Sequence, residues 1–413
     1  MNLSQVQTFL LGQGVDGWLL YNFRDLNPIA IAVAGLRHGG SRRWFLWIPA
    51  QGQPRWLVHG IEGHMFADVA ADLQGPMQRY VSWQEMAAAL PQLLGVTDRA
   101  QGAPARILME YSPGNAIPFI SRIDAGIKEV VEAATGAEIL SSADVAQVAL
   151  AVLSEAQVAG HRRAAQACLA AKDSAFDYIA EQLKAGMTPT EYEVQQFISA
   201  QFAAMGMEPL PCIVSVNANA ADPHYGPSEK HHSPIRVGDM VLIDLWTKEA
   251  DNPEGSMADC TWTAYCGAVV PEKVKAVYDV VAATRDRAVA FIRERLAAGA
   301  TVRGHEVDAA ARAVVEEAGY GRYFIHRTGH SLGPTGHYLG VNIDGLETED
   351  RRELLPGVMF TVEPGIYMPE FNFDDSPTPK GLGIRSEINC LMTPGHVEVT
   401  TLPIQSEVRP LLA

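Results

Sequence analysis

A pattern repeated at a constant spacing constrains the fold of this chain more than any other feature. The segment Leu183–Thr188 is matched by Leu296–Thr301, and the later glycines Gly206 and Gly319 keep the same offset, since 299 − 186 = 113 and 319 − 206 = 113. Each copy is typical of a helix that ends at a glycine, a second helix capped by threonine, and a further glycine stop. In the first copy, Thr188–Glu191 also fits a capping box with proline at the first helical position. Because all matched pairs share one offset, two related α/β halves explain the pattern better than chance similarity between Ala-rich helices.

Metal-binding side chains follow the first copy, in short segments that have the pattern of strands or adjoining turns. They are Asp244, Asp259, His330, Glu363 and Glu387. Four carboxylates gathered in one place repel one another unless cations neutralise them, and two divalent cations would balance the charge. Oxygen-rich ligation with a single histidine suits hard or borderline metals, and a pair of ions about 3.5–4 Å apart is typical of hydrolytic sites. A solvated strand end explains one such acid alone, but not all of them inside apolar runs.

Alternation of side chains places the two aspartates on one sheet face. In Met240–Trp246, Asp244 shares a face with Leu242 and Trp246, and in Met257–Thr263, Asp259 shares a face with two threonines. The loop between these segments carries a proline and a glycine, so a hairpin is expected to set the aspartates side by side. Likewise, Gly383–Asn389 is expected to form one strand with Arg385 and Glu387 on the same face, where the guanidinium orients the carboxylate.

Five motifs together resemble the pita-bread metallopeptidases, a family that includes methionine aminopeptidase, aminopeptidase P and prolidase. The motifs are Ile243-Asp-Leu245, Asp259-Cys-Thr-Trp-Thr263, His326-Arg-Thr-Gly-His330-Ser-Leu-Gly333, Thr361-Val-Glu-Pro-Gly365 and Ile384-Arg-Ser-Glu387. The resemblance implies a pita-bread catalytic domain, an α/β (α+β) fold with an internal pseudo-two-fold repeat. It also implies that Asp244 binds one metal, that His330 and Glu363 bind the other, and that Asp259 and Glu387 bridge the two. The aspartates are 259 − 244 = 15 positions apart, more than is usual in this family, so the hairpin loop carries an insertion.

Three further histidines stand where the family keeps histidines that face the substrate: His224, His326 and His337. An imidazole beside the metals can donate to a developing oxyanion or to the scissile nitrogen. Since the chain has 12 histidines, a surface position is the alternative for each, and only the motifs single these out. Glu363 is a candidate proton shuttle as well as a ligand, and Arg385 is counted among the candidate catalytic residues.

The length of 413 residues suits two domains. We expect an N-terminal α/β domain over residues 1–152 and the catalytic domain over 153–413. The expected N-terminal strands are Val15–Tyr21, Arg43–Ile48 and Arg106–Glu110. The expected N-terminal helices are Gln5–Leu11 and Trp83–Leu94. The catalytic domain is expected to open with a helix over Leu153–Leu183. No residue in the N-terminal domain points to chemistry. In aminopeptidase P and prolidase such a domain supports dimerisation and walls the active site, so the resemblance implies a homodimer or a dimer of dimers.

Composition excludes some partners. The balance of charged residues, 32 − 48 = −16, argues against nucleic acid. No segment has the pattern of a signal peptide or a membrane-spanning helix, so no membrane association is expected. The five cysteines are odd in number and scattered, which favours a reducing cytoplasm over a disulfide framework.

The resemblance implies hydrolysis of the bond before proline with two divalent ions, Mn, Co or Zn, acting on a small proline-containing peptide. Prolidase activity on Xaa-Pro dipeptides is favoured, with aminopeptidase P activity as the alternative. Creatinase shares the fold but works without metal and lacks this ligand set, and non-catalytic pita-bread binding modules have lost ligands. A dipeptidase needs a cation beyond the proline site: Arg385 is expected to be engaged with Glu387, and Arg327 lies beside His326. The insertion, with Lys248, Glu249, Asp251 and Glu254, could cap the cleft or form an ordinary exposed hairpin.

Overall fold

The computed structural model describes residues 1–67, 69–96, 103–374 and 376–413. The chain divides into two compact units, Met1–Leu150 and Ala151–Ala413. None of the helices in these described ranges combines the length and the apolar character needed to cross a membrane.

The N-terminal unit is built on one mixed sheet with strand order β4-β3-β2-β1-β5-β6. The strands are β1 (Gly17–Asn22), β2 (Trp44–Pro49), β3 (Arg55–His59), β4 (Met77–Tyr80), β5 (Arg106–Met109) and β6 (Glu138–Ser141). The pairs β1–β2 and β2–β3 are antiparallel, whereas β3–β4, β1–β5 and β5–β6 are parallel. The expected strands near β1, β2 and β5 are present, and β3, β4 and β6 are additional.

Helices cover this sheet and complete its core. They are α1 (Leu3–Gly12), α2 (Pro28–Ala34), α3 (Trp83–Leu94), α4 (Ala125–Thr135) and α5 (Ala143–Ala146). Leu90 of α3 and Val131 of α4 pack on Leu19, Phe45 and other apolar side chains of the sheet. Both helices begin at side-chain caps, Ser82 and Asp124, which accept backbone N–H groups of their first turns. The unit therefore has an independent apolar core.

The described residues of the C-terminal unit form three sheets, with strand orders β16-β9-β8-β7, β10-β11-β14-β15 and β12-β13. The strands of the first sheet are β7 (Ile213–Val216), β8 (Met240–Thr247), β9 (Ala258–Tyr265) and β16 (Arg409–Pro410). Those of the second sheet are β10 (Ser331–Leu332), β11 (Met359–Val362), β14 (Ile388–Thr393) and β15 (His396–Val399). The third sheet consists of β12 (Gly365–Met368) and β13 (Leu382–Arg385). Most residues of these strands are buried, which suits sheets covered by helices.

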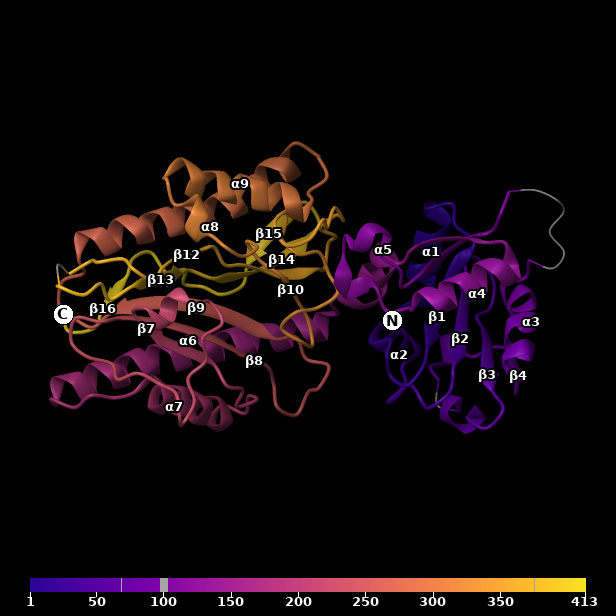
Figure 1. Ribbon diagram of the computed structural model, residues 1–413, viewed down its shortest axis with the longest axis horizontal. Coiled ribbons are helices and arrows are strands. Elements are labelled where there is room, and N and C mark those ends of the chain that lie inside the picture. Colours follow the sequence, from indigo (N-terminus) through magenta and orange to yellow (C-terminus); the bar gives the residue numbers. More distant parts are fainter. Residues whose placement is uncertain (68, 97–102, 375) are drawn as a thin grey trace. The chain divides into compact units, whose positions relative to one another are not determined.

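Two helix pairs enclose these sheets, with α6 and α7 on one side and α8 and α9 on the other (Figure 1). They are α6 (Glu155–Lys184), α7 (Glu191–Ala204), α8 (Glu272–Ala297) and α9 (Gly304–Glu317). The repeat seen in the sequence corresponds to these pairs, because α7 and α9 begin 304 − 191 = 113 positions apart. The glycines that follow the helices all adopt the left-handed conformation that favours glycine: Gly186 (φ 77°), Gly206 (φ 73°), Gly299 (φ 65°) and Gly319 (φ 83°).

The expected threonine caps are wrong in detail. The capping box of α7 is formed by Thr190 and Glu193, not by Thr188 and Glu191, because Glu191 is buried and accepts hydrogen bonds from another segment. In the second copy, α9 begins after Arg303, which makes no side-chain cap. The helices follow the repeat, and their first turns do not.

The hairpin of β8 and β9 places its aspartates on one face but not directly opposite each other. Asp244 pairs with Thr261, and Asp259 pairs with Trp246. The two carboxylates are therefore diagonal neighbours, two positions apart, a separation that side chains can still bridge.

The expected strand Gly383–Asn389 is interrupted. β13 ends at Arg385 and pairs with β12, whereas β14 begins at Ile388 and pairs with β11. Ser386 and Glu387 lie at the change of partner. Arg385 and Glu387 nevertheless line the same cavity, as the expected alternation implied.

Candidate metal centre

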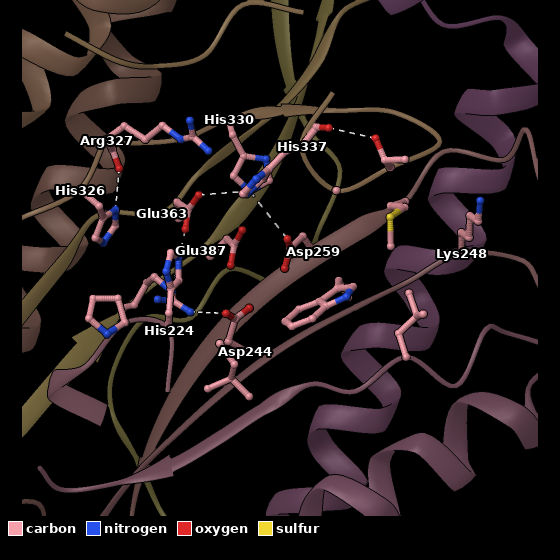
Figure 2. Close-up of a pocket in the computed structure, with 18 of the residues that line it drawn as sticks. His224, Asp244, Lys248, Asp259, His326, Arg327, His330, His337, Glu363 and Glu387 are labelled. Atoms are coloured by element: carbon pink, nitrogen blue, oxygen red, sulfur yellow. Dashed lines mark hydrogen bonds and ion pairs between the residues drawn. The ribbon is translucent and has the colours of Figure 1, made fainter. Parts of the chain in front are cut away.

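The five candidate ligands come together in one cavity of the C-terminal unit, as Figure 2 shows. The hairpin supplies Asp244 from β8 and Asp259 from β9, and the second half of the unit supplies the rest. His330 stands just before β10, Glu363 between β11 and β12, and Glu387 just before β14. Residues from both copies of the repeat thus face the same space.

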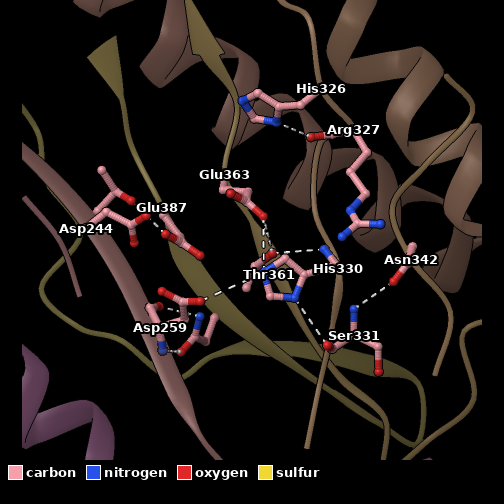
Figure 3. Close-up of polar contacts among 12 residues, drawn as sticks. Asp244, Asp259, His326, Arg327, His330, Ser331, Asn342, Thr361, Glu363 and Glu387 are labelled. Atoms are coloured by element: carbon pink, nitrogen blue, oxygen red, sulfur yellow. Dashed lines mark hydrogen bonds and ion pairs between the residues drawn. The ribbon is translucent and has the colours of Figure 1, made fainter. Parts of the chain in front are cut away.

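The distances among these side chains suit shared cations. Ligand atoms of Asp259, His330 and Glu387 all lie within 4.8 Å of one another. His330 Nε2 lies 3.3 Å from Glu363 Oε1 and 3.8 Å from Asp259 Oδ2 (Figure 3). Two ligand atoms that each bind one ion at about 2.0–2.2 Å are separated by such distances.

His330 is oriented to offer a lone pair to a cation. Its Nδ1 lies 3.2 Å from the Ser331 carbonyl oxygen, so a ring protonated at Nδ1 donates to that carbonyl and leaves the Nε2 lone pair facing Glu363 and Asp259. Burial lowers the pKa of His330 to about 3, so the ring is neutral at pH 7. An unprotonated nitrogen facing carboxylates is unfavourable without a cation and favourable with one.

The acids have the electrostatic signature of a metal site. Burial, and then the charge of Glu387, raises the pKa of Asp259 well above its usual range. Burial, and then the charge of Glu363, does the same to the pKa of Glu387. Asp259 Oδ1 and Glu387 Oε1 are buried and have no hydrogen-bond partner among the described residues. Two orphaned carboxylate oxygens of this kind are costly unless cations bind them, so the residues fit divalent metal ions.

Side chains around the ligands hold them in place, and the sequence motifs did not assign these roles. Thr361 Oγ1 donates to Glu363 Oε1 at 3.0 Å and accepts from the His330 N–H at 2.9 Å. Thr261 Oγ1 donates to Glu387 Oε2 at 2.8 Å. Each threonine lies two positions from a ligand, Asp259 or Glu363, so alternation along the strand was the available signal for both.

Arg385 is paired with a different ligand from the one expected. Its guanidinium forms an ion pair with Asp244, donates from Nε to Thr261 Oγ1 at 2.9 Å and donates from Nη1 to Tyr367 OH at 3.2 Å. The expected engagement with Glu387 is indirect, because Thr261 Oγ1 accepts from Arg385 and donates to Glu387. Arg385 Nε also lies 4.0 Å from Glu363 Oε2, and burial still raises the pKa of Asp244.

His326 has both ring nitrogens engaged within the protein. Nδ1 donates to the Arg327 carbonyl at 2.7 Å, and Nε2 lies 2.8 Å from Tyr367 OH. Burial lowers the pKa of His326 to about 4 and raises that of Tyr367 to about 12, so a neutral ring accepts from a protonated phenol. His326 thereby supports Tyr367 and, through it, Arg385. Tyr367 was not predicted, and no sequence pattern singled it out.

His224 and His337 are exposed and line the cavity. The His337 ring lies 4.3 Å from the His330 ring, centroid to centroid, at an angle of 69°. Desolvation of the ring in the cavity wall, and then proximity to His330, lowers the pKa of His337 to about 4, so the ring is neutral at pH 7 and can donate one N–H. These two histidines, unlike His326, are free to face a bound molecule.

The cavity that contains the ligands has a volume of about 600 Å³, a size that suits a small organic molecule. Part of its wall is apolar. The apolar lining residues are Leu210, Ile213, Pro223, Trp246, Met257 and Pro334. Three cationic side chains also line it: Lys248, Arg327 and Arg385.

The insertion between the aspartates contributes one side chain to this cavity. Lys248 lines it and donates to the carbonyl oxygens of Pro253 at 2.9 Å and Pro334 at 3.1 Å. Glu249 instead faces α6, where Arg163 Nη2 donates to its Oε2 at 3.0 Å. The insertion is thus fixed on its own unit, and Glu249, Asp251 and Glu254 are not among the lining residues.

The architecture and the site can be compared with those of known proteins. Residues 159–394 match the profile of metallopeptidase family M24. An Xaa-Pro dipeptidase of Lactobacillus delbrueckii subsp. lactis is 31% identical over 201 residues, which are 48% of this chain and 50% of that protein. The chain thus spans about half the length of the curated relatives it matches.

Solved structures extend the likeness in fold over nearly the whole chain. Dipeptidase PepE from Mycobacterium ulcerans has a TM-score of 0.69 at 23% identity, covering 99% of this chain and 96% of that one. The X-Pro aminopeptidase from Thermotoga maritima has a TM-score of 0.58 at 20% identity, covering 96% and 98%. The expected pita-bread fold, preceded by a smaller α/β domain, is confirmed. Since the family profile covers more than half of the chain and the site carries the acids and histidine expected of it, this protein belongs to metallopeptidase family M24.

Proposed function

We propose that this protein is a dinuclear metal-dependent peptidase that hydrolyses the bond before proline, with Xaa-Pro dipeptides as its substrates, which is prolidase activity. The observation that carries the proposal is the group of buried carboxylates with unpaired oxygens beside the Nε2 lone pair of His330, in a cavity of about 600 Å³. A folded protein could not enter a space of this size, whereas a short peptide could.

The ligand set would hold two divalent ions, with Asp244 at one, His330 and Glu363 at the other, and Asp259 and Glu387 between them. Mn, Co and Zn all suit this donor set. Bound ions would supply Lewis acidity for hydrolysis of an amide. Glu363, held by Thr361, can take up a proton and pass it to the leaving nitrogen. His224 and His337 can donate N–H groups to the oxyanion.

Selectivity for proline has a physical basis in the cavity. An Xaa-Pro bond has no N–H, so recognition through a backbone hydrogen bond at that position is impossible. The apolar wall, including Ile213 and Trp246, can instead surround the pyrrolidine ring. The chain would then select proline by burying the ring rather than by pairing with the amide.

Preference for a dipeptide over a longer peptide is supported by the cations of the cavity. Arg385 uses its guanidinium on Asp244, Thr261 and Tyr367, and Lys248 uses two N–H groups on carbonyl oxygens. Arg327, by contrast, has Glu347 as an ion-pair partner at 3.9 Å, beyond hydrogen-bond distance, and its side chain is 18% exposed. Arg327 is therefore the cation best able to bind the C-terminal carboxylate of a dipeptide.

Comparing hydrolysis of Ala-Pro with that of Ala-Pro-Ala tests this proposal. Faster cleavage of Ala-Pro supports the dipeptidase, whereas faster cleavage of Ala-Pro-Ala favours aminopeptidase P activity, which the likeness to an X-Pro aminopeptidase keeps as the second candidate. Full activity after exhaustive chelation would contradict the metal-dependent mechanism. Elemental analysis that finds fewer than one activating divalent ion per chain would favour a non-catalytic binding module.

We also propose that the protein acts in the cytoplasm as a homodimer, with the N-terminal unit supporting dimerisation. All five cysteines are free and buried, which suits a reducing compartment. Light scattering that reports one chain per particle at working concentration would contradict the dimer.

A further inference from the structure

A fully buried carboxylate at the start of α7 collects hydrogen bonds from a distant segment. Glu191 Oε1 accepts from the Val216 N–H at 2.7 Å and from Asn219 Nδ2 at 2.9 Å. Its Oε2 accepts from Tyr225 OH and from the Ser233 N–H, both at 2.6 Å. A carboxylate can be stabilised without a cation when it accepts several such bonds at a helix N-terminus.

All four donor residues lie in residues 216–233, here called the His224 segment because it carries that histidine. The backbone N–H of Glu191 also donates to the Ser233 carbonyl at 3.0 Å, so both ends of the segment are tied to one residue. Within the segment, Tyr225, which bonds to Glu191, directly follows His224. A shift of Glu191 would therefore move the ring that lines the cavity.

The second copy of the repeat contains a comparable buried carboxylate that accepts hydrogen bonds from a distant segment. Asp308 of α9 is buried, and its Oδ1 accepts from the Thr328 N–H at 3.0 Å and from Thr328 Oγ1 at 2.6 Å. Arg312, one turn later on α9, donates to the His326 carbonyl at 2.9 Å and to Asp308 Oδ1 at 3.0 Å. Each repeated helix thus holds, through a buried carboxylate, a segment that carries a histidine of the site.

We propose that Glu191 is a positioning residue that acts through His224, by fixing the His224 segment so that the imidazole faces the cavity. The inference rests on the proposed function for its kinetic consequence, but not for its structural one. Glu191 does not line the cavity and is 0% exposed, so it cannot touch a substrate itself.

The variant Glu191→Gln tests the structural part. Glutamine keeps the shape of the side chain but replaces one acceptor oxygen with an NH₂ group, which would face donors. Hydrogen exchange should become faster in residues 216–233 and stay unchanged in residues 324–345. The matched variant Asp308→Asn should give the reverse pattern, because it changes the same kind of group on α9. Unchanged exchange in residues 216–233 of Glu191→Gln would overturn the proposal.

The kinetic part is tested by a double-mutant cycle with His224→Ala on Ala-Pro. Glu191→Gln alone should lower kcat/KM by about 10- to 100-fold, the range for partners that orient a functional group. In the His224→Ala background the same substitution should have little further effect, because its consequence passes through the lost ring. Additive losses, or an unchanged kcat/KM, would contradict action through His224. The losses in kcat/KM caused by Asp308→Asn and His224→Ala should be additive in the double variant.

Tyr225→Phe provides a milder test should Glu191→Gln fail to fold. It removes the single 2.6 Å bond to Glu191 Oε2 and should show the same non-additivity with His224→Ala, and additivity would again overturn the proposal. A wild-type protein that cleaves neither Ala-Pro nor Ala-Pro-Ala would contradict the proposed function, and the exchange experiment would still decide whether Glu191 holds the segment.

Discussion

Asp259 shows at the level of a single residue why this site needs a cation. Its carboxylate is buried, one oxygen is unpaired, and its strand position is fixed by Asn389, whose Nδ2 donates to the Asp259 carbonyl at 2.6 Å. Its side chain was identifiable from the sequence because an acid in an apolar strand needs a partner. The partner of Arg385 was not identifiable, since that depended on where a strand ends.

Replacing Asp259 with asparagine should abolish tight binding of the metals. The amide is neutral and leaves the remaining ligands with one negative charge fewer for the cations, so the loss should exceed the about 10- to 100-fold typical of residues that only orient a ligand. Elemental analysis and Ala-Pro hydrolysis measure this. Asp251→Asn, on the exposed part of the insertion, is the matched control and should retain both properties.

Arg327→Met should weaken binding of dipeptides selectively. A charge-assisted hydrogen bond is worth about 1.5–3 kcal/mol, so KM for Ala-Pro should rise by about 10- to 100-fold. Ala-Pro-amide has no carboxylate, so its KM should not change. Lys248→Met tests whether Lys248 binds the dipeptide carboxylate instead. Arg322→Met, at an exposed position, is the control and should leave KM for Ala-Pro unchanged. A large effect on the amide would mean that Arg327 has another role.

Glu110 of the N-terminal unit should make stability depend on pH. Burial raises its pKa from 4.5 to about 7, and Trp18 Nε1 and Asn27 Nδ2 donate to it at 2.6 and 2.7 Å. Since the folded-state pKa is the higher one, its stabilising effect is complete below about pH 4.5 and is lost as pH rises to 7. The slope is about 1.4 kcal/mol per pH unit. The free energy of unfolding in urea should change less over pH 5–7 for Glu110→Gln than for the wild type. An equal dependence on pH in the two proteins would contradict this.

Strand β9 is the element that most directly connects the fold to the site. It carries Asp259 as a ligand and Thr261 as support for Glu387 and Arg385. Alternation predicted the face, and the hairpin confirms it with the aspartates diagonal rather than opposite. The start of α7 could not be chosen from sequence, because Thr188–Glu191 and Thr190–Glu193 both fit a capping box and burial of Glu191 decided between them.

Thr261→Val should reduce metal affinity by about 10- to 100-fold, because valine keeps the shape but removes the hydroxyl that holds Glu387. Thr263→Val is a matched control on the same face of the same strand. The Thr263 hydroxyl is buried without a partner among the described residues, so its removal should leave metal binding unchanged and stability equal or higher. Metal titrations measured by calorimetry distinguish the two variants, and equal losses would assign the effect to strand packing.

The molecule as a whole consists of two units with separate cores, and all candidate ligands belong to Ala151–Ala413. Sequence patterns predicted the ligand-bearing segments of that unit better than they predicted the strands of the N-terminal unit. In the N-terminal unit, β4 was missed because three of its four residues are exposed and show no alternation. Short edge strands of this kind carry too little periodicity to be recognised.

Metal should therefore stabilise one unit only. Free metal at 100 times its dissociation constant adds about 2.7 kcal/mol to the stability of the species that binds it. Hydrogen exchange with and without a chelator should show slower opening in residues 151–413 when metal is present, and no change in the core of β1 and β2. Equal protection of both units would show that the units unfold together.

The separation of the ligands along the chain has a consequence for how the molecule folds. Asp244 and Glu387 are 387 − 244 = 143 positions apart, and the hairpin that carries Asp244 and Asp259 lines the same cavity as His330, Glu363 and Glu387 from the other half of the unit. Closing loops of this length precedes any complete ion site, so the cations cannot nucleate the chain. Bound cations would therefore stabilise the contact between two halves that have already met, and we expect them to slow the separation of the halves rather than to speed their association.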